Sequence, residues 1–162
     1  GDGIVRAMRV EVCAAVVERD GRLLLRRRPA GCHLAGAWEF PGGKRRPGER
    51  GRACAERETR EETGLRVRAG REIARVDHDY ADRRLRLRFF AAVPAGGRLR
   101  RSPSLRWTAP AALARMRIPD ANRGLVARLI AEAASRRRRP PRGASARARR
   151  GRGTPSPRPK AR

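Results

Sequence analysis

Apolar residues fall into short runs along most of the chain, and their spacing predicts several strands. Residues 9–17 (RVEVCAAVV) have a strand pattern, and Asp20-Gly21 predicts a tight turn into a partner strand over residues 22–26. Residues 85–93 alternate before becoming wholly apolar, which is typical of a strand that enters a core. Strands are also expected at residues 65–76 and 105–108.

Two helices are expected in addition. The first runs from about Glu49 to Thr63 and ends at Gly64, since glycine readily adopts the left-handed conformation that stops a helix. The last spans residues 122–134. Residues 29–48 hold five glycines and three prolines, which predicts a long loop with a short extended piece at 38–40. Mixed strands flanked by two helices indicate an α/β or α+β sandwich.

The chain is strongly basic. The chain has 162 residues and carries 42 Lys and Arg against 16 Asp and Glu, a net charge of +26 that favours polyanionic partners. Only two of the cations are lysines, as GC-rich coding DNA would produce, so the charge alone says little about function. No run approaches the roughly 20 apolar residues that cross a bilayer, and no signal peptide is visible. We therefore expect a cytoplasmic protein without membrane contact. Its three cysteines, widely spaced and without a CxxC pair, are expected to be reduced packing residues.

Residues 135–162 differ from the rest of the chain. They hold twelve cations, no anion, and nothing apolar larger than alanine and proline. Such a segment cannot bury enough surface to offset its ordering entropy, so we predict a disordered basic tail after a single domain over residues 1–134. The tail predicts weak, non-specific contact with nucleic acid. The sequence begins without Met, which leaves Gly1 and Met8 as alternative native starts.

Three glutamates share one face of the first expected helix. Glu58, Glu61 and Glu62 stand at i, i+3 and i+4, which places their carboxylates within about one helical turn. In an ordinary helix this is a solvated acidic face, and that interpretation stays open. Here the surroundings are rich in arginine, and Mg²⁺ uses clustered carboxylates together with substrate phosphates. The pattern indicates a Mg²⁺ site for a phosphorylated substrate, in which Arg57 would hold a carboxylate.

The spacing around these glutamates resembles the Nudix box. From Gly43 the sequence reads GKRRPGERGRACAERETREETGL, which fits G-x5-E-x7-R-E-U-x-E-E-x-G-U, with U a bulky apolar residue. Thr59 departs from the pattern at the first apolar position, and Leu65 satisfies the second. Seven fixed positions match: Gly43, Glu49, Arg57, Glu58, Glu61, Glu62 and Gly64.

Segments outside the box extend the resemblance to MutT-type Nudix hydrolases, which include 8-oxo-dGTP diphosphatases. The segments GAWEFPGGK, HDYADRRLRLRFF and PDANRGLV carry it over roughly residues 9–133. It implies a Nudix α/β/α sandwich with a mixed sheet, and an enzyme that uses Mg²⁺ or Mn²⁺ to convert a nucleoside triphosphate to its monophosphate and pyrophosphate. The implied site has Gly43, Glu58, Glu61 and Glu62 as metal ligands, Glu58 and Glu61 as catalytic groups, and Arg57 and Glu49 as the residues that orient the cluster.

The same resemblance implies a substrate pocket. Arg28 matches a phosphate-contacting arginine and Asn122 an asparagine that reads the base, while His33, Phe40 and Phe90 match further substrate positions. The residues also admit plainer roles. Arg28 would then be a solvated strand end, Asn122 a helix N-cap, His33 a structural residue, and one of Phe89 and Phe90 part of the core.

One departure concerns the general base. Many relatives carry a glutamate before the strand that ends in Trp, whereas this chain has Arg101 and Ser102 in RSPSLRW. Either the box glutamates supply the base, or activity is weak or lost, unless His78 and Asp79 reach the metals. Our leading hypothesis is hydrolysis of an oxidised purine triphosphate such as 8-oxo-dGTP. The alternatives are a CTP-like pyrimidine, a dinucleoside polyphosphate or nucleotide sugar, and a catalytically reduced scaffold that binds nucleic acid through its tail.

Overall fold

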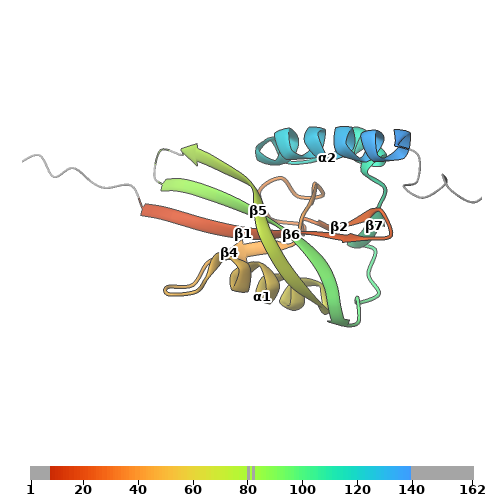
Figure 1. Cartoon of the computed structure of the whole chain (residues 1–162). Coiled ribbons are helices and arrows are strands. Elements are labelled where there is room, and N and C mark those ends of the chain that lie inside the picture. Colours follow the sequence, from red (N-terminus) through yellow and green to blue (C-terminus); the bar gives the residue numbers. More distant parts are fainter. Residues whose placement is uncertain (1–7, 80, 82, 140–162) are drawn as a thin grey trace, which may run out of the picture.

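A mixed β-sheet dominates the computed structural model, which describes residues 8–79, 81 and 83–139 (Figure 1). Within these residues, two α-helices and one 3-10 helix accompany the sheet. The strands are β1 (Met8–Arg19), β2 (Arg22–Arg27), β3 (Trp38–Glu39), β4 (Gly42–Lys44), β5 (Leu65–Asp79), β6 (Arg83–Gly97) and β7 (Leu105–Thr108). The helices are α1 (Gly51–Thr63), η1 (Pro110–Arg115) and α2 (Asp120–Arg138). In the described part of the chain, none of them is long and apolar enough to cross a membrane.

Strand β1 organises the sheet, whose order is β3-β2-β1-β6-β5. β1 runs parallel to β6 on one side. On its other side it pairs antiparallel first with β4 and then, near its end, with β2. β7 pairs with β2. The β4 pairing fixes Gly43 opposite Cys13 and so holds the loop before α1 against the middle of the sheet.

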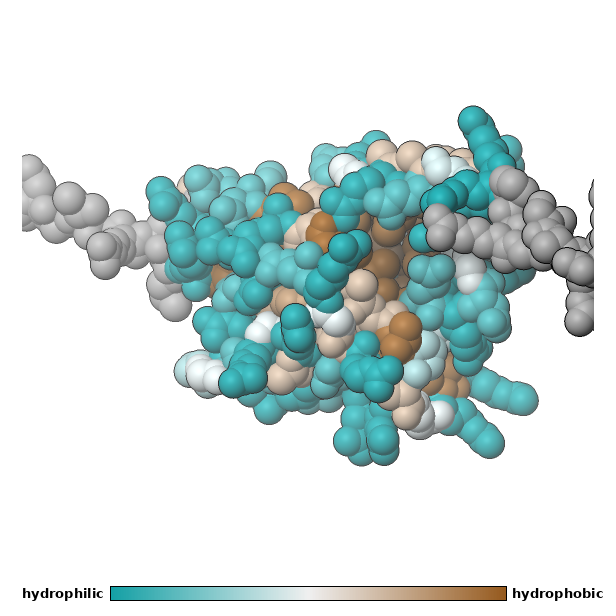
Figure 2. Space-filling view, viewed as in Figure 1, coloured by the Kyte–Doolittle hydropathy of each residue, from teal (hydrophilic) through white to brown (hydrophobic). Residues whose placement is uncertain are grey.

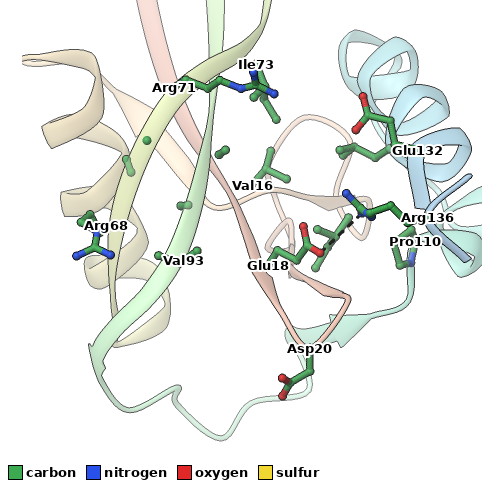
Figure 3. Close-up of a pocket in the computed structure, with 16 residues that line it drawn as sticks. Val16, Glu18, Asp20, Arg68, Arg71, Ile73, Val93, Pro110, Glu132 and Arg136 are labelled. Atoms are coloured by element: carbon green, nitrogen blue, oxygen red, sulfur yellow. Dashed lines mark ion pairs between the residues drawn. The ribbon is translucent and has the colours of Figure 1, made fainter. Parts of the chain in front are cut away.

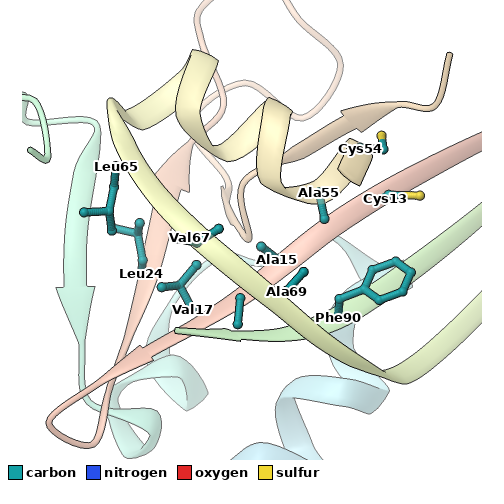
Figure 4. Close-up of a cluster of buried hydrophobic side chains, with 11 residues drawn as sticks. Cys13, Ala15, Val17, Leu24, Cys54, Ala55, Leu65, Val67, Ala69 and Phe90 are labelled. Carbon is teal, nitrogen blue, oxygen red and sulfur yellow. The ribbon is translucent and has the colours of Figure 1, made fainter. Parts of the chain in front are cut away.

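The two α-helices cover opposite faces of the sheet (Figure 1). α1 contributes Cys54 and Ala55 to a buried cluster that also contains Phe90 of β6 (Figure 4). α2 contributes Leu125 and Val126 to a second cluster on the other face. This arrangement confirms the α/β/α sandwich with a mixed sheet.

Threonine replaces a bulky apolar residue on the underside of α1 without leaving a polar atom unpaired. Thr59 is fully buried, and its hydroxyl donates a hydrogen bond to the carbonyl oxygen of Ala55 at 2.7 Å. The hydroxyl of Thr63 donates in the same way to Thr59. Helix α1 then stops at Gly64, whose φ of +79° is the left-handed conformation expected there.

Several element boundaries differ from the sequence predictions. α1 begins at Gly51, so Glu49 lies in the loop before the helix rather than in its first turn. Strand β4 was not predicted within the loop over residues 29–48, because a Gly-Gly-Lys segment carries no apolar alternation. The 3-10 helix η1 was also not predicted.

The prediction of disorder is wrong for residues 135–138, because α2 continues to Arg138. Arginine is a good helix former, and cations at a helix C-terminus interact favourably with the helix dipole. Arg136 also lies 3.7 Å from a carboxylate oxygen of Glu18 on β1. Arg139 is extended, as expected before a proline. Residues 140–162 lie outside the described part of the chain, so the predicted tail is untested there.

Candidate functional site

Arg57 is the centre of a carboxylate cluster on α1 and the loop before it. Its guanidinium donates two hydrogen bonds to Glu49, from Nε to Oε1 at 2.7 Å and from Nη2 to Oε2 at 3.0 Å. Nη1 donates to Glu58 at 2.8 Å and reaches Glu61 at 3.3 Å. Nη2 also donates to the carbonyl oxygen of Lys44. One side chain thus ties the loop to the helix face and contacts three carboxylates.

The electrostatics of this pair follow from the bidentate contact. Hydrogen bonds from Arg57 lower the pKa of Glu49 to about 2, and the same bonds raise the pKa of Arg57 above its usual range. Both groups therefore stay charged throughout the physiological range. A permanently charged pair is suited to positioning other groups, not to transferring protons.

Glu62 occupies a much more enclosed position on α1 than Glu61. Its side chain is 15% exposed, against 51% for Glu61. Burial is the largest effect and raises the pKa of Glu62 to about 7; Arg26 opposes it, and the Glu58 and Glu39 carboxylates reinforce it. Within the described residues, Glu62 Oε2 is buried and accepts no hydrogen bond.

The backbone at Gly43 approaches the Glu58 carboxylate so closely that a side chain at this position would have to displace it. A Cβ atom there would lie 2.3 Å from the carboxyl carbon of Glu58 and 2.5 Å from its Oε2. The carbonyl oxygen of Gly43 accepts the thiol hydrogen of the buried Cys54 at 3.5 Å. The backbone of β4 therefore lies directly against the Glu58 carboxylate.

These groups fit a hard divalent cation. They offer three carboxylates, one of which has a buried oxygen without a hydrogen bond, and a backbone carbonyl at a glycine that adds no side chain. As the side chains stand, no three His, Cys, Asp or Glu residues in the described ranges are gathered closely enough to hold a metal ion. The guanidinium groups of Arg57 and Arg26 instead form ion pairs with the carboxylates of Glu58 and Glu62. Binding of a metal ion by these carboxylates therefore requires the arginines to give up ion pairs.

Arg28 lies at the edge of this cluster, at the start of the loop that follows β2. Its Nη1 donates to Glu39 Oε2 at 2.9 Å, and its Nε donates to the carbonyl oxygen of His33 at 2.7 Å. These bonds fix the guanidinium beside the carboxylates, where it can meet a phosphate group. The His33 residue itself is exposed.

Asn122 faces the sheet from the first turn of α2. It is 6% exposed and stands at i, i+3 and i+4 with the buried Leu125 and Val126. The N-cap of α2 is Pro119 and makes no side-chain bond, so the alternative role of Asn122 as the helix cap is wrong. Phe40 belongs to the same buried cluster on this face.

Phe90, predicted as a substrate contact, lies in the hydrophobic core. Its ring is 2% exposed and packs in the α1-side cluster, on the face of the sheet away from Asn122. The adjacent Phe89 points to the α2 side instead, where its ring meets Phe40 edge-on with centroids 6.1 Å apart. Neighbouring residues of a strand face opposite sides of a sheet, which decides between the two phenylalanines.

Two residues of the cluster were not predicted, Arg26 of β2 and Glu39 of β3. Arg26 Nε lies 3.0 Å from Glu62 Oε2, and Arg26 Nη1 lies 3.4 Å from Glu39 Oε1. The only signal in the sequence is alternation, because Arg26 lies two positions after the core residue Leu24 and so shares its face.

Arg100, directly before the segment that replaces the usual downstream acid, has a structural role. Arg100 donates to the carbonyl oxygens of Glu61 at 2.8 Å and Glu62 at 3.3 Å, and so satisfies the C-terminal end of α1. Arg101 is exposed. Asp79, considered as a substitute acid, lies 3.7 Å from Arg84 on β6.

A separate cavity of about 710 Å³ lies between the sheet and the C-terminal half of α2 (Figure 3). Apolar side chains gather in a hollow beneath α2 (Figure 2). Glu18, Glu132 and Arg136 stand around the cavity, and Arg136 and Glu18 form an ion pair. None of the predicted site residues lines it.

Comparison with known proteins adds independent information. A family model described as the NUDIX domain matches residues 12–128. The CTP pyrophosphohydrolase of Escherichia coli (strain K12) is 44% identical over 78 residues, which are 48% of this chain and 58% of that protein. The 8-oxo-dGTP diphosphatase of Proteus vulgaris is 34% identical over 83 residues, 51% of this chain and 74% of that protein.

A solved structure agrees with these matches. The solution structure of the E. coli ORF135 protein superposes with a TM-score of 0.66 at 31% sequence identity, covering 82% of this chain and 96% of that one. The likeness thus extends over the whole sandwich. The match to the CTP pyrophosphohydrolase, by contrast, spans little more than half of that relative.

Proposed function

The chain belongs to the Nudix family, and from this premise we propose that it is a Mg²⁺-dependent nucleoside triphosphate pyrophosphohydrolase that releases the monophosphate and pyrophosphate. The observation that carries the proposal is the cluster of Glu58, Glu61 and Glu62 held by Arg57 beside the open backbone of Gly43. Mn²⁺ is expected to replace Mg²⁺, because both accept oxygen ligands.

Each group has a separate role in this proposal. Glu58, Glu61, Glu62 and the Gly43 carbonyl would hold the metal, which supplies charge neutralisation at the phosphates and a nucleophilic water. Arg57 and Glu49 orient these ligands. The box glutamates also provide the proton acceptor, since Arg101 occupies the position of the downstream acid.

Substrate recognition would involve the loop after β2 and the start of α2. Arg28, fixed by Glu39 and the His33 carbonyl, would bind a phosphate through its remaining N–H groups. Asn122 would read the base edge by donating and accepting hydrogen bonds, over an apolar floor that includes Phe40. His33, exposed in the same loop, would contribute to the rim.

Two base classes have support. An amide that both donates and accepts suits an oxidised purine such as that of 8-oxo-dGTP, and one relative carries that substrate in its name. The relative of higher identity is named a CTP pyrophosphohydrolase, which favours a cytosine nucleotide as the second candidate. Either substrate would place the protein among enzymes of the free nucleotide pool, and a cytoplasmic location is consistent with that role.

Pyrophosphate release measured with 8-oxo-dGTP, dGTP, CTP and dCTP, with and without Mg²⁺, tests this proposal. The charge-matched variants Glu61→Gln and Glu132→Gln make the comparison specific, because both side chains are 51% exposed and only Glu61 lies in the cluster. We expect Glu61→Gln to lower turnover by about two orders of magnitude and Glu132→Gln to leave it unchanged. Equal activities of the two variants would refute the assigned role of Glu61.

A further inference from the structure

Arg26 is an arginine inside the carboxylate cluster. In β2 it follows Leu24 by two positions and therefore faces α1, while Arg27 faces the opposite side with Leu25. In the register between β2 and β3, Arg26 lies opposite Glu39. The strand thus directs one positive charge at the C-terminal end of α1, where Glu62 stands.

The Arg26 guanidinium contacts two carboxylates, those of Glu62 and Glu39. Its Nε lies 3.0 Å from Glu62 Oε2, and its Nη1 lies 3.4 Å from Glu39 Oε1. The three side chains are between 15% and 26% exposed, so water screens these charges only partly. The contact to Glu62 is an ion pair without hydrogen-bond geometry, since Oε2 accepts no hydrogen bond within the described residues.

We propose that Arg26 competes with a divalent cation for Glu62 and so weakens metal binding by the cluster. A metal ligated by Glu62 would lie within a few ångströms of the guanidinium, and two cations at that distance repel each other. Glu39 remains as a carboxylate partner of Arg26 when Glu62 binds a metal ion. The inference rests on the proposed function only in requiring that the α1 carboxylates bind a divalent cation.

A binding measurement without nucleotide tests this competition. Mn²⁺ is titrated into the full chain at pH 8, and the loss of the free Mn²⁺ electron paramagnetic resonance signal reports affinity and stoichiometry. Arg26→Met keeps the aliphatic stem and removes the charge, so we expect Mn²⁺ to bind about tenfold more tightly, as loss of one nearby repulsive charge predicts. Arg26→Lys, which retains the charge, should bind close to wild type.

Two controls separate competition at Glu62 from a change in overall charge. Arg27→Met makes the same substitution on the opposite face of β2 and should leave Mn²⁺ affinity unchanged. In a Glu62→Gln background, Arg26→Met should bring no gain, because the contested ligand is missing. Circular dichroism melts establish that every variant is folded.

Unchanged or weaker Mn²⁺ binding by a folded Arg26→Met variant would overturn the inference, as would a gain that persists in the Glu62→Gln background. Absence of Mn²⁺ binding by all variants would overturn it too. Hydrolysis is measured separately. If the protein hydrolyses no nucleotide and still shows the Glu62-dependent gain in Mn²⁺ affinity, this inference holds and the proposed function is wrong. If it hydrolyses nucleotides and shows no such gain, the proposed function holds and this inference is wrong.

Discussion

Replacement of Glu62 by glutamine should stabilise the protein while removing its proposed activity. Glu62 is enclosed by the fold, and burial raises the pKa of its carboxyl from 4.5 to about 7. The folded state therefore favours the protonated side chain, whereas the unfolded chain releases the proton near pH 4.5. A glutamine has nearly the same shape and carries no charge at any pH.

The magnitude and sign follow from proton linkage. Between pH 4.5 and about 7 the folded state holds one proton more than the unfolded state, so stability falls as pH rises through this window. At about 1.4 kcal/mol for each pKa unit, the full penalty is about 3 kcal/mol above pH 7 and is absent below pH 4.5. The advantage of Glu62→Gln over the wild type should therefore grow from near zero at pH 4.5 to about 3 kcal/mol at pH 8.

Urea unfolding with EDTA present, at pH 4.5 and pH 8, measures this difference directly. Glu61→Gln is the matched control, because it removes the same charge from an exposed position on the same helix and should change stability little at either pH. An advantage of Glu62→Gln that stays constant across this range, or that is largest at pH 4.5, would refute the reasoning.

Three further predictions concern separate parts of the molecule. Gly43→Ala should lower Mg²⁺-dependent turnover more than about tenfold, because its Cβ would displace the Glu58 carboxylate, whereas Gly124→Ala, with no atom near its new Cβ, should have no effect. Asn122→Ala should collapse the kcat/KM ratio between 8-oxo-dGTP and dGTP while basal hydrolysis persists; an unchanged ratio would exclude Asn122 as the reader of the base. Truncation after Arg139 should leave hydrolysis intact and remove salt-sensitive binding to single-stranded DNA in a filter assay, and loss of hydrolysis would contradict the division.

Much of the sandwich could be predicted because its elements have local signals. β1 and β2 follow from apolar runs joined by a turn at Asp20-Gly21, and α1 ends at Gly64 as expected. β4 could not be predicted, since Gly42-Gly43-Lys44 becomes a strand only through pairing with β1. The extension of α2 to Arg138 was not predicted, because the charge of the arginine run indicates disorder. Arginine is nevertheless a good helix former.

The candidate site, too, could be predicted from the sequence only in part. Glu58, Glu61 and Glu62 could be placed on one face because their spacing fixes it within a single helix. The pairing of Arg26 with Glu62 depends on where α1 packs against β2, and spacing along the sequence does not contain that information.

The same limit applies to Phe89 and Phe90. The choice between these neighbours depends on which side of β6 faces α2, which is decided by the packing of the whole sheet. A resemblance assigns such positions only to within one residue, and one residue reverses the face of a strand.

The function proposed for the α1 carboxylate cluster is metal-dependent hydrolysis of nucleoside triphosphates to monophosphate and pyrophosphate. Phosphorus NMR of products formed in H₂¹⁸O with Mg²⁺ tests it most directly, with 8-oxo-dGTP and CTP as substrates. We expect the monophosphate and pyrophosphate, with the ¹⁸O label in pyrophosphate, as attack of water on the β-phosphorus requires, and loss of both products in Glu58→Gln. Release of inorganic phosphate instead of pyrophosphate, or undiminished turnover by Glu58→Gln, would contradict it.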